Sequence, residues 1–294
     1  MVATGGARDV TALVEEFAAA RQNPALAVLE GFHAVKHALR FGARPRRLVA
    51  VDPGALEQLA ATLAPDLCGA FRRLAEPVPV DVFRQLARAA PHTGTMAIAD
   101  RPVRDPAAIL ADPAARPVVF LEDPRHLGNV GAVIRVAAAA GAAGVLTSGR
   151  CDPWDPAALR GSAGLHFAVP VAHLAHPPAG TRSRTGPRGA DAGPRLADPA
   201  PQAADPAPQA ADPGSRRPLV ALDPAGERIA PDALPRRAVL AFGTERHGLS
   251  AQLRAGADLT VRIPMRPGVS SLNLATSVAI LLYCWTGPDD LPAG

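Results

Sequence analysis

The sequence predicts an α/β protein built on a parallel β-sheet, and three features support this prediction. The apolar run 118–122, a helical segment and the apolar run 144–147 form a β-α-β unit, whose crossover joins parallel strands. The apolar runs 219–222 and 238–242 are typical of further strands that are buried in such a sheet. Helices and short strands also alternate over residues 10–99, which indicates a small α/β domain.

The first predicted domain comprises residues 1–105. Its expected helices, each with apolar residues on one face, span residues 10–21, 32–40, 55–63 and 80–89. Its expected strands span residues 48–51 and 94–99, and residues 26–31 are either a strand or a turn. Asp9 or Thr11 is the expected N-cap of the first helix, and Gly42 the residue that ends the second. Several arginines either contact phosphate groups or form a solvated charged face, and they are Arg44, Arg46, Arg47, Arg72 and Arg73.

A proline-punctuated linker, residues 106–116, leads to the second predicted domain, residues 117–294. Asn129 is expected at the start of the helix in the β-α-β unit. The remaining strands of this domain are expected over residues 166–171 and 258–263. A buried final helix follows the last strand, with Ser270 or Ser271 as its N-cap.

An insertion interrupts the second domain at about residues 177–217, where the chain consists mainly of Pro, Ala, Gly, Asp and Arg. Residues 197–203 repeat without change as residues 204–210. Such a segment cannot bury a core, so we expect it to be disordered. The insertion is tolerable because the closure entropy of a flexible surface loop grows only slowly with its length.

Composition limits the functional classes. Hydrophobic residues make up 48% of the 294 residues, enough for a packed core, and the net charge of +4 permits a polyanionic partner without requiring one. The three cysteines are scattered without a CxxC pair, so neither a metal site nor a disulfide framework is expected. The chain has no apolar leader and no stretch of membrane-spanning length, which predicts a cytoplasmic protein with no membrane partner.

Three glycine-containing loops each follow a predicted strand and carry polar residues. The first holds Asn129, with Arg135 six residues later, the second holds Glu245, and the third holds Ser271 and Asn273. Ligands bind at the carboxyl ends of the strands in open parallel sheets, so these loops are candidate ligand sites. Each loop taken alone also has a plainer interpretation, either a solvated turn or a capped helix start. A nucleotide-dependent enzyme of ordinary doubly wound topology is disfavoured, because neither GxGxxG nor a Walker pattern is present.

Together the loops resemble the motifs of the SpoU (TrmH-type) branch of the SPOUT methyltransferases. The matching positions are Asn129-x-Gly131-x-x-x-Arg135-x-Ala137, Phe242-Gly243-x-Glu245-x-x-Gly248-Leu249, and Ile263-Pro264-Met265 followed by Ser271-Leu272-Asn273. The likeness covers residues 117–175 and 218–286. Residues 30–35 and 92–94 more loosely resemble the L30e-like RNA-binding domain of that family.

The resemblance implies a trefoil-knotted SPOUT methyltransferase domain with a parallel sheet, preceded by a small L30e-like α/β RNA-binding domain. It also implies ribose 2'-O-methylation of RNA with S-adenosylmethionine as cofactor, in a homodimer whose active site lies near the subunit interface. The catalytic residues implied by the motifs are Arg135, Asn129, Glu245, Ser271 and Asn273. The cofactor-binding residues implied by the motifs are Gly243, Thr244, Ile263, Met265 and Leu272.

A guanidinium does not act as a base at neutral pH, so Arg135 is expected to bind the target phosphate and to polarise the attacking hydroxyl. Asn129 and Asn273 would orient the hydroxyl and the ribose, while Glu245 and Ser271 would position their neighbours. Ribosomal RNA is favoured over transfer RNA, because an L30e-like domain suits structured RNA with exposed loops. The alternative is a non-catalytic RNA-binding or ribosome-assembly protein that retains the fold.

Overall fold

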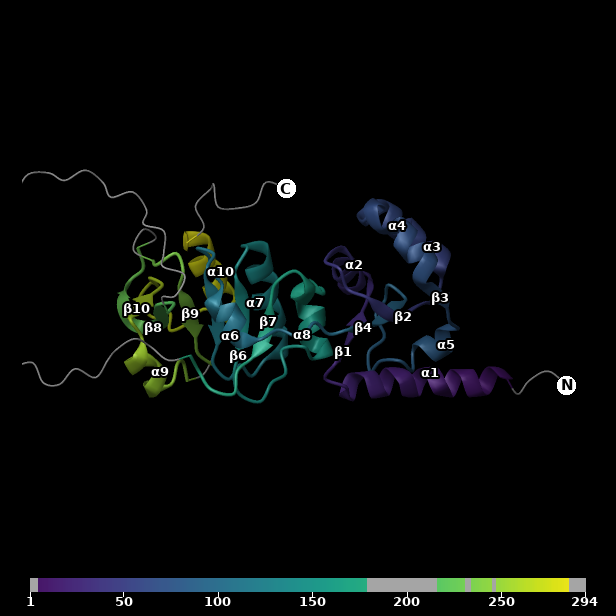
Figure 1. Ribbon diagram of the computed structural model, residues 1–294, viewed down its shortest axis with the longest axis horizontal. Coiled ribbons are helices and arrows are strands. Elements are labelled where there is room, and N and C mark those ends of the chain that lie inside the picture. The colour runs from purple at the N-terminus through teal and green to yellow at the C-terminus, as the bar shows by residue number, and fades with distance from the viewer. Residues whose placement is uncertain (1–4, 179–215, 231–233, 245–246, 286–294) are drawn as a thin grey trace, which may run out of the picture.

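The computed structural model describes residues 5–178, 216–230, 234–244 and 247–285, which form two units that lie side by side (Figure 1). The N-terminal unit contains a four-stranded sheet and the C-terminal unit a six-stranded sheet. Every strand pairing in the six-stranded sheet is parallel, so the prediction of an α/β protein with a parallel sheet is confirmed. None of the helices in these described ranges is long and apolar enough to cross a membrane.

The N-terminal sheet has the strand order β1-β4-β2-β3, and helices cover both of its faces. The strands are β1 (Leu26–Glu30), β2 (Pro45–Ala50), β3 (Ala75–Pro77) and β4 (Thr95–Asp100). Helices α1 (Gly5–Gln22) and α5 (Val80–Phe83) pack on one face, and α2 (Phe32–Arg40), α3 (Pro53–Leu63) and α4 (Cys68–Leu74) lie on the other. β4 runs antiparallel to β1 and β2, so this sheet is mixed.

Sequence reasoning missed α4 and β3, and the reason is that both are held by packing. α4 has only seven residues, too few to be stable alone. Its Phe71 is fully buried, and the Phe71 ring stacks on that of Phe32 with 5.4 Å between the centroids. β3 is a three-residue strand that pairs with the edge of β2.

Two helix boundaries in this unit also differ from the prediction. α1 begins at Gly5, so Asp9 and Thr11 lie inside the helix and do not cap it. The helix expected over residues 80–89 ends at Phe83, although Leu86 beyond it stays buried in the cluster that joins α1 to the sheet. Residues 26–30 form a strand, and Gly42 follows α2 with φ +83°, as expected of a residue that ends a helix.

The C-terminal sheet has the strand order β10-β8-β9-β5-β6-β7. Its strands are β5 (Val118–Leu121), β6 (Gly144–Thr147), β7 (Val171–His173), β8 (Leu219–Arg228), β9 (Val239–Phe242) and β10 (Leu259–Arg262). Its helices are α6 (Pro106–Ala111), α7 (Leu127–Ala139), α8 (Pro156–Gly161), α9 (Ala251–Gly256) and α10 (Leu274–Trp285). The helix that begins just before Asn129 and the strands at 118, 144, 219 and 239 match the predicted elements.

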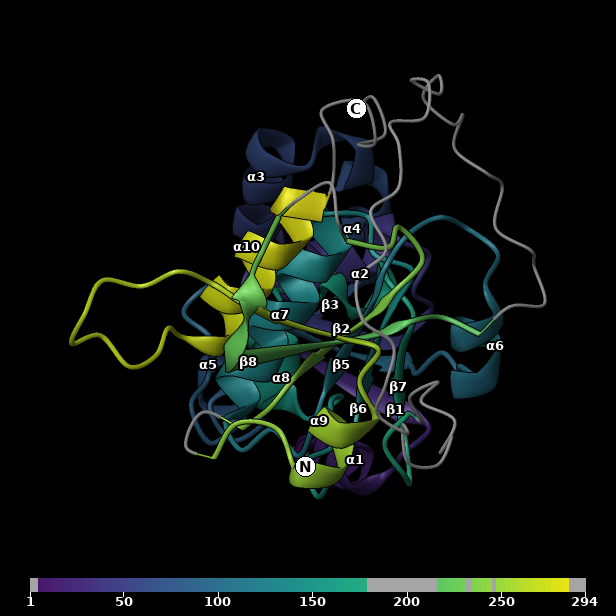
Figure 2. The ribbon, with the colours of Figure 1, turned by 90° about the vertical axis from the view of Figure 1, so that its left-hand side faces the viewer.

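Both faces of the centre of this sheet are buried, which explains why its central strands β5 and β9 are uninterrupted apolar runs. Val118 and Phe120 belong to the core cluster that includes residues of α6 and α9. Val119 and Leu121 point to the opposite face and belong to the cluster that includes residues of α7, α8 and α10. Figure 2 shows α7 and α10 on one side of the sheet and α9 on the other.

The strand predicted over residues 166–171 is wrong in its first half. Ala163 and Gly164 both have positive φ, +53° and +78°, and they turn the chain into a short 3-10 segment, Leu165–Phe167. Gly164 is required there because a Cβ atom would overlap with the backbone of Ala34 in α2. Only after this turn does the chain enter β7, so contact with the other unit overrides the local strand preference.

His166 in this turn is fully buried and makes two hydrogen bonds. Its Nε2 lies 2.6 Å from the Pro153 carbonyl oxygen and therefore carries the proton, and its Nδ1 lies 2.7 Å from the Ser162 hydroxyl. Trp154 packs on the imidazole with 4.9 Å between the ring centroids. Burial lowers the pKa of His166 from 6.5 to about 4, because the charged ring would lose its hydration.

The free energy of unfolding is therefore expected to fall by roughly 3 kcal/mol as the pH drops from 6.5 towards 4. The unfolded chain binds a proton at His166 in this window and the folded chain does not, so acid favours unfolding. Urea unfolding across the window measures the slope. In the variant His166→Gln the slope should be correspondingly shallower, and an unchanged slope would assign the pH dependence to other groups.

The segment predicted as a linker contains α6, and α6 is part of the core. Ile109 of this helix is buried against the parallel sheet. Arg217, predicted to lie in the disordered insertion, is also buried and donates hydrogen bonds to the carbonyl oxygens of Leu110, Asp112 and Arg116. Residues 179–215 of the predicted insertion lie outside the described residues.

Direct contacts join the two units. His37 Nδ1 in α2 lies 2.8 Å from the Ala163 carbonyl oxygen. Arg160 Nη1 in α8 lies 2.6 Å from Glu30 Oε2 at the end of β1, and the Glu30 side chain is only 6% exposed. The Arg101 guanidinium lies 5.2 Å from the Trp154 ring centroid. These contacts hold the two units together and place α2 against the turn at Ala163 and Gly164, which matters for the site.

Candidate active site

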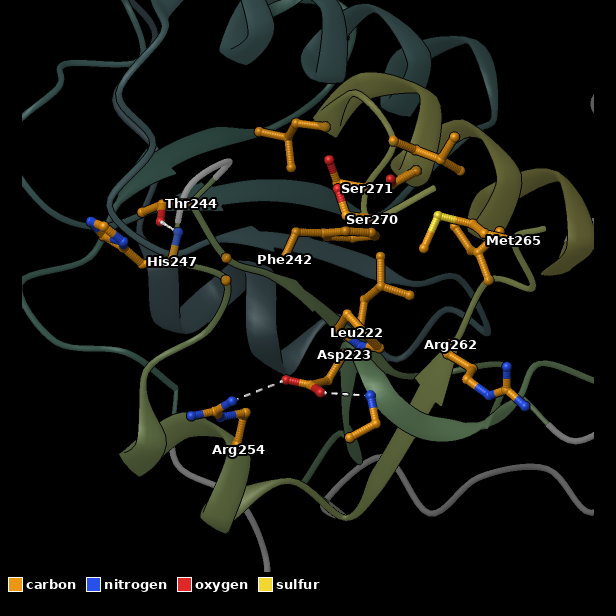
Figure 3. Close-up of a pocket in the computed structure, with 18 residues that line it drawn as sticks. Leu222, Asp223, Phe242, Thr244, His247, Arg254, Arg262, Met265, Ser270 and Ser271 are labelled. Carbon is orange, nitrogen blue, oxygen red and sulfur yellow. Dashed lines mark hydrogen bonds and ion pairs between the residues drawn. The ribbon is translucent and has the colours of Figure 1, made fainter. Parts of the chain in front are cut away.

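A cavity of about 560 Å³ opens at the carboxyl ends of β8, β9 and β10 (Figure 3). Three chain segments and Arg254 of α9 line it. The segments are residues 222–225, residues 242–244 with 247 and 248, and several residues between 262 and 277. The last two segments contain the second and third loops of the sequence analysis. The carboxyl edge of a parallel sheet is the expected place for a ligand site, and the volume suits a small organic ligand.

The first wall of the cavity is an excursion of β8. Strands β8 and β10 pair Ala221 with Thr260 and then Glu227 with Val261, so residues 222–226 of β8 bulge out of the pairing between the two strands. The chain returns at Gly226, where a Cβ atom would meet backbone atoms of Val261 at 2.7 Å. The excursion carries Leu222 and Asp223 into the cavity wall (Figure 3).

The second wall is the loop after β9. Thr244 and Gly248 form an isolated antiparallel bridge, with the Gly248 N–H 2.9 Å from the Thr244 carbonyl oxygen. The His247 N–H also donates to the Thr244 hydroxyl at 3.0 Å. Gly243 lies so close beneath this bridge that a Cβ atom would overlap with the backbone of Gly248 and Leu249. Glu245, which follows Thr244 in the sequence, lies outside the described residues.

The third wall precedes α10. Asn273 caps this helix, since its Oδ1 accepts hydrogen bonds from the N–H groups of Ala275 and Thr276, so the expectation of Ser270 or Ser271 as N-cap is wrong. Both serines line the cavity instead.

Asn273 also joins the first and third loops. Its Nδ2 donates a hydrogen bond of 3.2 Å to Oδ1 of Asn129, which lies in the first turn of α7. The two residues are 144 positions apart in the chain. The first and third predicted loops are thus in direct contact, through the hydrogen bond between α7 and the start of α10.

Arg135 lies two turns further along α7 and faces the N-terminal unit. Its side chain is exposed. The pKa of His33 is lowered by burial first, then by the charge of Lys36 and then by that of Arg135. The pKa of Lys36 is lowered by burial first, then by the charge of Arg40 and also by that of Arg135. Arg135 therefore lies beside α2, in a group of basic side chains contributed by both units.

The predicted residues thus lie in three places. All five residues that were predicted to bind the cofactor line the cavity, and so does Ser271. The five are Gly243, Thr244, Ile263, Met265 and Leu272. Asn129 and Asn273 pair next to its third wall. Arg135 lies on the α2 side of α7, and it is not among the residues that line the cavity. The described residues contain no cluster of His, Cys, Asp or Glu suited to a metal ion.

Sequence reasoning missed the residues that the β8 excursion and α9 contribute to the cavity. These include Asp223 and Arg254, whose charged groups lie 3.3 Å apart. The only signal was the turn-forming sequence Asp223-Pro224-Ala225-Gly226 directly after an apolar run.

Comparison with known proteins gives a consistent picture. A model of the SpoU rRNA Methylase family matches residues 116–179 and 208–283. An uncharacterized tRNA/rRNA methyltransferase of Mycobacterium tuberculosis is 30% identical over 271 residues, which cover 88% of this chain and 80% of that protein. The crystal structure of AdoMet-bound rRNA methyltransferase from Sinorhizobium meliloti superposes with a TM-score of 0.62 and 25% identity, over 97% of this chain and 95% of that one.

A curated relative whose activity is stated aligns with a smaller part of this chain. The 23S rRNA (adenosine(1067)-2'-O)-methyltransferase of Streptomyces laurentii is 30% identical over 169 residues, which cover 56% of this chain and 52% of that protein. The chain thus spans about half the length of this and similar curated relatives.

Proposed function

We propose that this chain, which belongs to the SpoU rRNA methylase family, is an S-adenosylmethionine-dependent methyltransferase that modifies ribose 2'-hydroxyls of RNA. The observation that carries the proposal is the hydrogen bond between Asn129 and Asn273 beside the cavity. It brings together the two polar loops that the reaction needs, next to a pocket of the right size for the cofactor. The printed activity of the Streptomyces laurentii relative supports the ribose as the site of methylation.

The residues of the cavity fit S-adenosylmethionine, which is the cofactor of this family. When bound, it supplies a methyl group on a positively charged sulfur. Leu222, Phe242 and Leu272 offer apolar surface for a flat base, and Leu272 keeps 38% of its surface exposed. The Gly243 backbone lies at the wall with no side chain to block approach. Such a site holds a ligand by shape and backbone groups.

In the proposed reaction the ribose hydroxyl oxygen would bond to the methyl carbon as the bond between that carbon and the sulfur breaks. S-adenosylhomocysteine would leave, and an oxygen of the neighbouring RNA phosphate would accept the hydroxyl proton. Asn129 and Asn273 hold each other in place and so present fixed amide groups that orient the ribose. Arg135 binds the phosphate next to the target ribose and polarises the hydroxyl, because its guanidinium donates hydrogen bonds and does not accept a proton. We assign Glu245 and Ser271 positioning roles. Most of the rate enhancement would come from alignment and electrostatics.

RNA is the proposed substrate, and ribosomal RNA is favoured over transfer RNA. The positive charge beside Arg135 supports this substrate, since Lys36 of α2 adds to the field of its guanidinium. We further propose that residues 1–105 form an L30e-like RNA-binding domain and residues 117–294 the methyltransferase domain. A trefoil knot, a homodimer through the methyltransferase domain and a cytoplasmic location complete the proposal, and all three stay predictions.

The substitution Asn273→Asp should separate the two roles of this residue. The introduced carboxylate would still cap α10, so the free energy of unfolding should change by less than about 1 kcal/mol. A carboxylate has no N–H to donate to Asn129, so methyl transfer should fall by about tenfold or more. Chemical denaturation and single-turnover methylation measure the two effects. Equal losses of stability and activity would mean that Asn273 acts only through the helix.

The direct test is methyl transfer from radiolabelled S-adenosylmethionine to purified ribosomal and transfer RNA. The proposal expects label in ribosomal RNA, in dinucleotides that resist alkaline hydrolysis because the 2'-hydroxyl is blocked. Label on free bases would overturn ribose methylation. RNA binding without cofactor binding or transfer would favour the alternative, a non-catalytic RNA-binding protein that retains the fold.

A further inference from the structure

We propose that Asp223 binds the ribose hydroxyls of the cofactor, which makes it a specificity-determining residue of the cavity. This inference rests on the proposed function, because it concerns the same pocket. Asp223 is the only acidic residue among the described residues that line the cavity. It lies outside the three motif loops and reaches the cavity only through the excursion of β8.

The carboxylate of Asp223 is held in one orientation. Its Oδ1 accepts a hydrogen bond of 2.9 Å from the Ala225 N–H, which closes the turn of the excursion. Its Oδ2 lies 3.3 Å from Nη1 of Arg254 in α9 (Figure 3). The side chain is only 11% exposed, so its orientation is maintained by protein contacts and not by solvent.

The carboxylate nevertheless keeps unused capacity to accept hydrogen bonds. A carboxylate offers about four lone-pair sites, and the two protein contacts occupy only part of them. The Arg254 contact is also longer than the roughly 2.7–2.9 Å of a close charge-assisted hydrogen bond. A ligand with hydroxyl donors can therefore bind Asp223 without displacing Arg254.

The charges around Asp223 favour a neutral donor. An anionic group such as a phosphate would be repelled by the carboxylate. A cationic ammonium group would gain less there than at an isolated carboxylate, because Arg254 already balances the charge and would repel it. A pair of neighbouring hydroxyls suits both the geometry and the charge, as in the dinucleotide-binding folds where an acidic residue binds the ribose.

The ribose and the amino-acid part of the cofactor can be distinguished with fragments. S-adenosylhomocysteine carries both parts, whereas 5'-methylthioadenosine carries the ribose without the ammonium and carboxylate groups. The 2',3'-dideoxy form of 5'-methylthioadenosine lacks the two hydroxyls as well. Calorimetric titration of the full chain with these three compounds reports binding without any dependence on RNA or turnover.

The variants are Asp223→Asn and Glu227→Gln. The amide introduced by Asp223→Asn retains an oxygen that accepts from the Ala225 N–H but loses the charge and the second acceptor. Glu227 is an exposed acid on the same strand and does not line the cavity, so Glu227→Gln is the matched control. Thermal unfolding of each variant without ligand checks that both remain folded.

We expect Asp223→Asn to weaken both S-adenosylhomocysteine and 5'-methylthioadenosine by about 10- to 100-fold, with Glu227→Gln unchanged. The wild type should bind the dideoxy form about 10- to 100-fold more weakly than 5'-methylthioadenosine. Asp223→Asn should bind the two fragments with nearly equal affinity, because the substitution and the removal of the hydroxyls abolish the same interaction.

Two results would overturn the inference while leaving the proposed function intact. One is a loss that appears with S-adenosylhomocysteine but not with the fragment, which would assign Asp223 to the ammonium group. The other is an equal cost of hydroxyl removal in wild type and Asp223→Asn. If the folded wild type bound none of the compounds, the proposed function would fail together with the inference.

Discussion

Replacement of Arg135 by alanine is expected to reduce methyl transfer by about 100- to 1000-fold, the usual effect of removing one group that stabilises charge in a transition state. Arg135 is exposed on α7 and does not line the cavity. The affinity for S-adenosylmethionine and the free energy of unfolding should therefore stay near those of the wild type. Single-turnover methylation, calorimetry and chemical denaturation together distinguish these effects.

The variant Arg135→Lys is the informative control for this result. Lysine keeps the positive charge but lacks the planar guanidinium that binds a phosphate and a hydroxyl together. We expect Arg135→Lys to be nearly as inactive as Arg135→Ala. Near-normal activity of the lysine variant would mean that only charge is needed, and the assigned role of Arg135 would be wrong.

Replacement of Gly243 by alanine is expected to weaken cofactor binding by about 100-fold or more and to lower the free energy of unfolding by about 1–3 kcal/mol. A Cβ atom at this position overlaps with the backbone of Gly248 and Leu249, and backbone atoms cannot rotate away as a side chain can. The bridge between Thr244 and Gly248 must open, and this displaces one wall of the cavity.

Gly128→Ala is the matched control. Gly128 lies in the first turn of α7, next to Asn129, and a Cβ atom there meets nothing within 4 Å. Alanine at this position should leave cofactor affinity unchanged and the protein as stable as the wild type or slightly more so. If Gly243→Ala behaved like Gly128→Ala in calorimetry and denaturation, the close approach at Gly243 would not be what shapes the cavity.

Much of the C-terminal unit could be predicted because its strands are buried on both faces. Val118 to Leu121 must all be apolar in that environment, and the β-α-β spacing leaves only a parallel pairing. The ends of these strands then locate the loops that line the cavity.

Elements that depend on distant contacts could not be predicted in this way. α4 is held by the stacking of Phe71 on Phe32, and the turn at Gly164 is held by close approach to Ala34. α6 was mistaken for a linker because its own Pro106 and the flanking Asp105, Asp112 and Pro113 indicate a loop, whereas its buried Ile109 anchors it to the sheet. Local sequence carries no record of such partners.

The sequence by itself determined the α/β class and the parallel sheet, since these depend on short-range patterns of apolar, glycine and polar residues. Its resemblance to the SpoU motifs implied the five residues from Gly243 to Leu272 that line the cavity. Only the tertiary structure decided that Asn273 pairs with Asn129, that Arg135 faces α2 and that Asp223 enters the cavity. Each of these depends on the folded path of the chain, which brings together side chains that no local pattern relates.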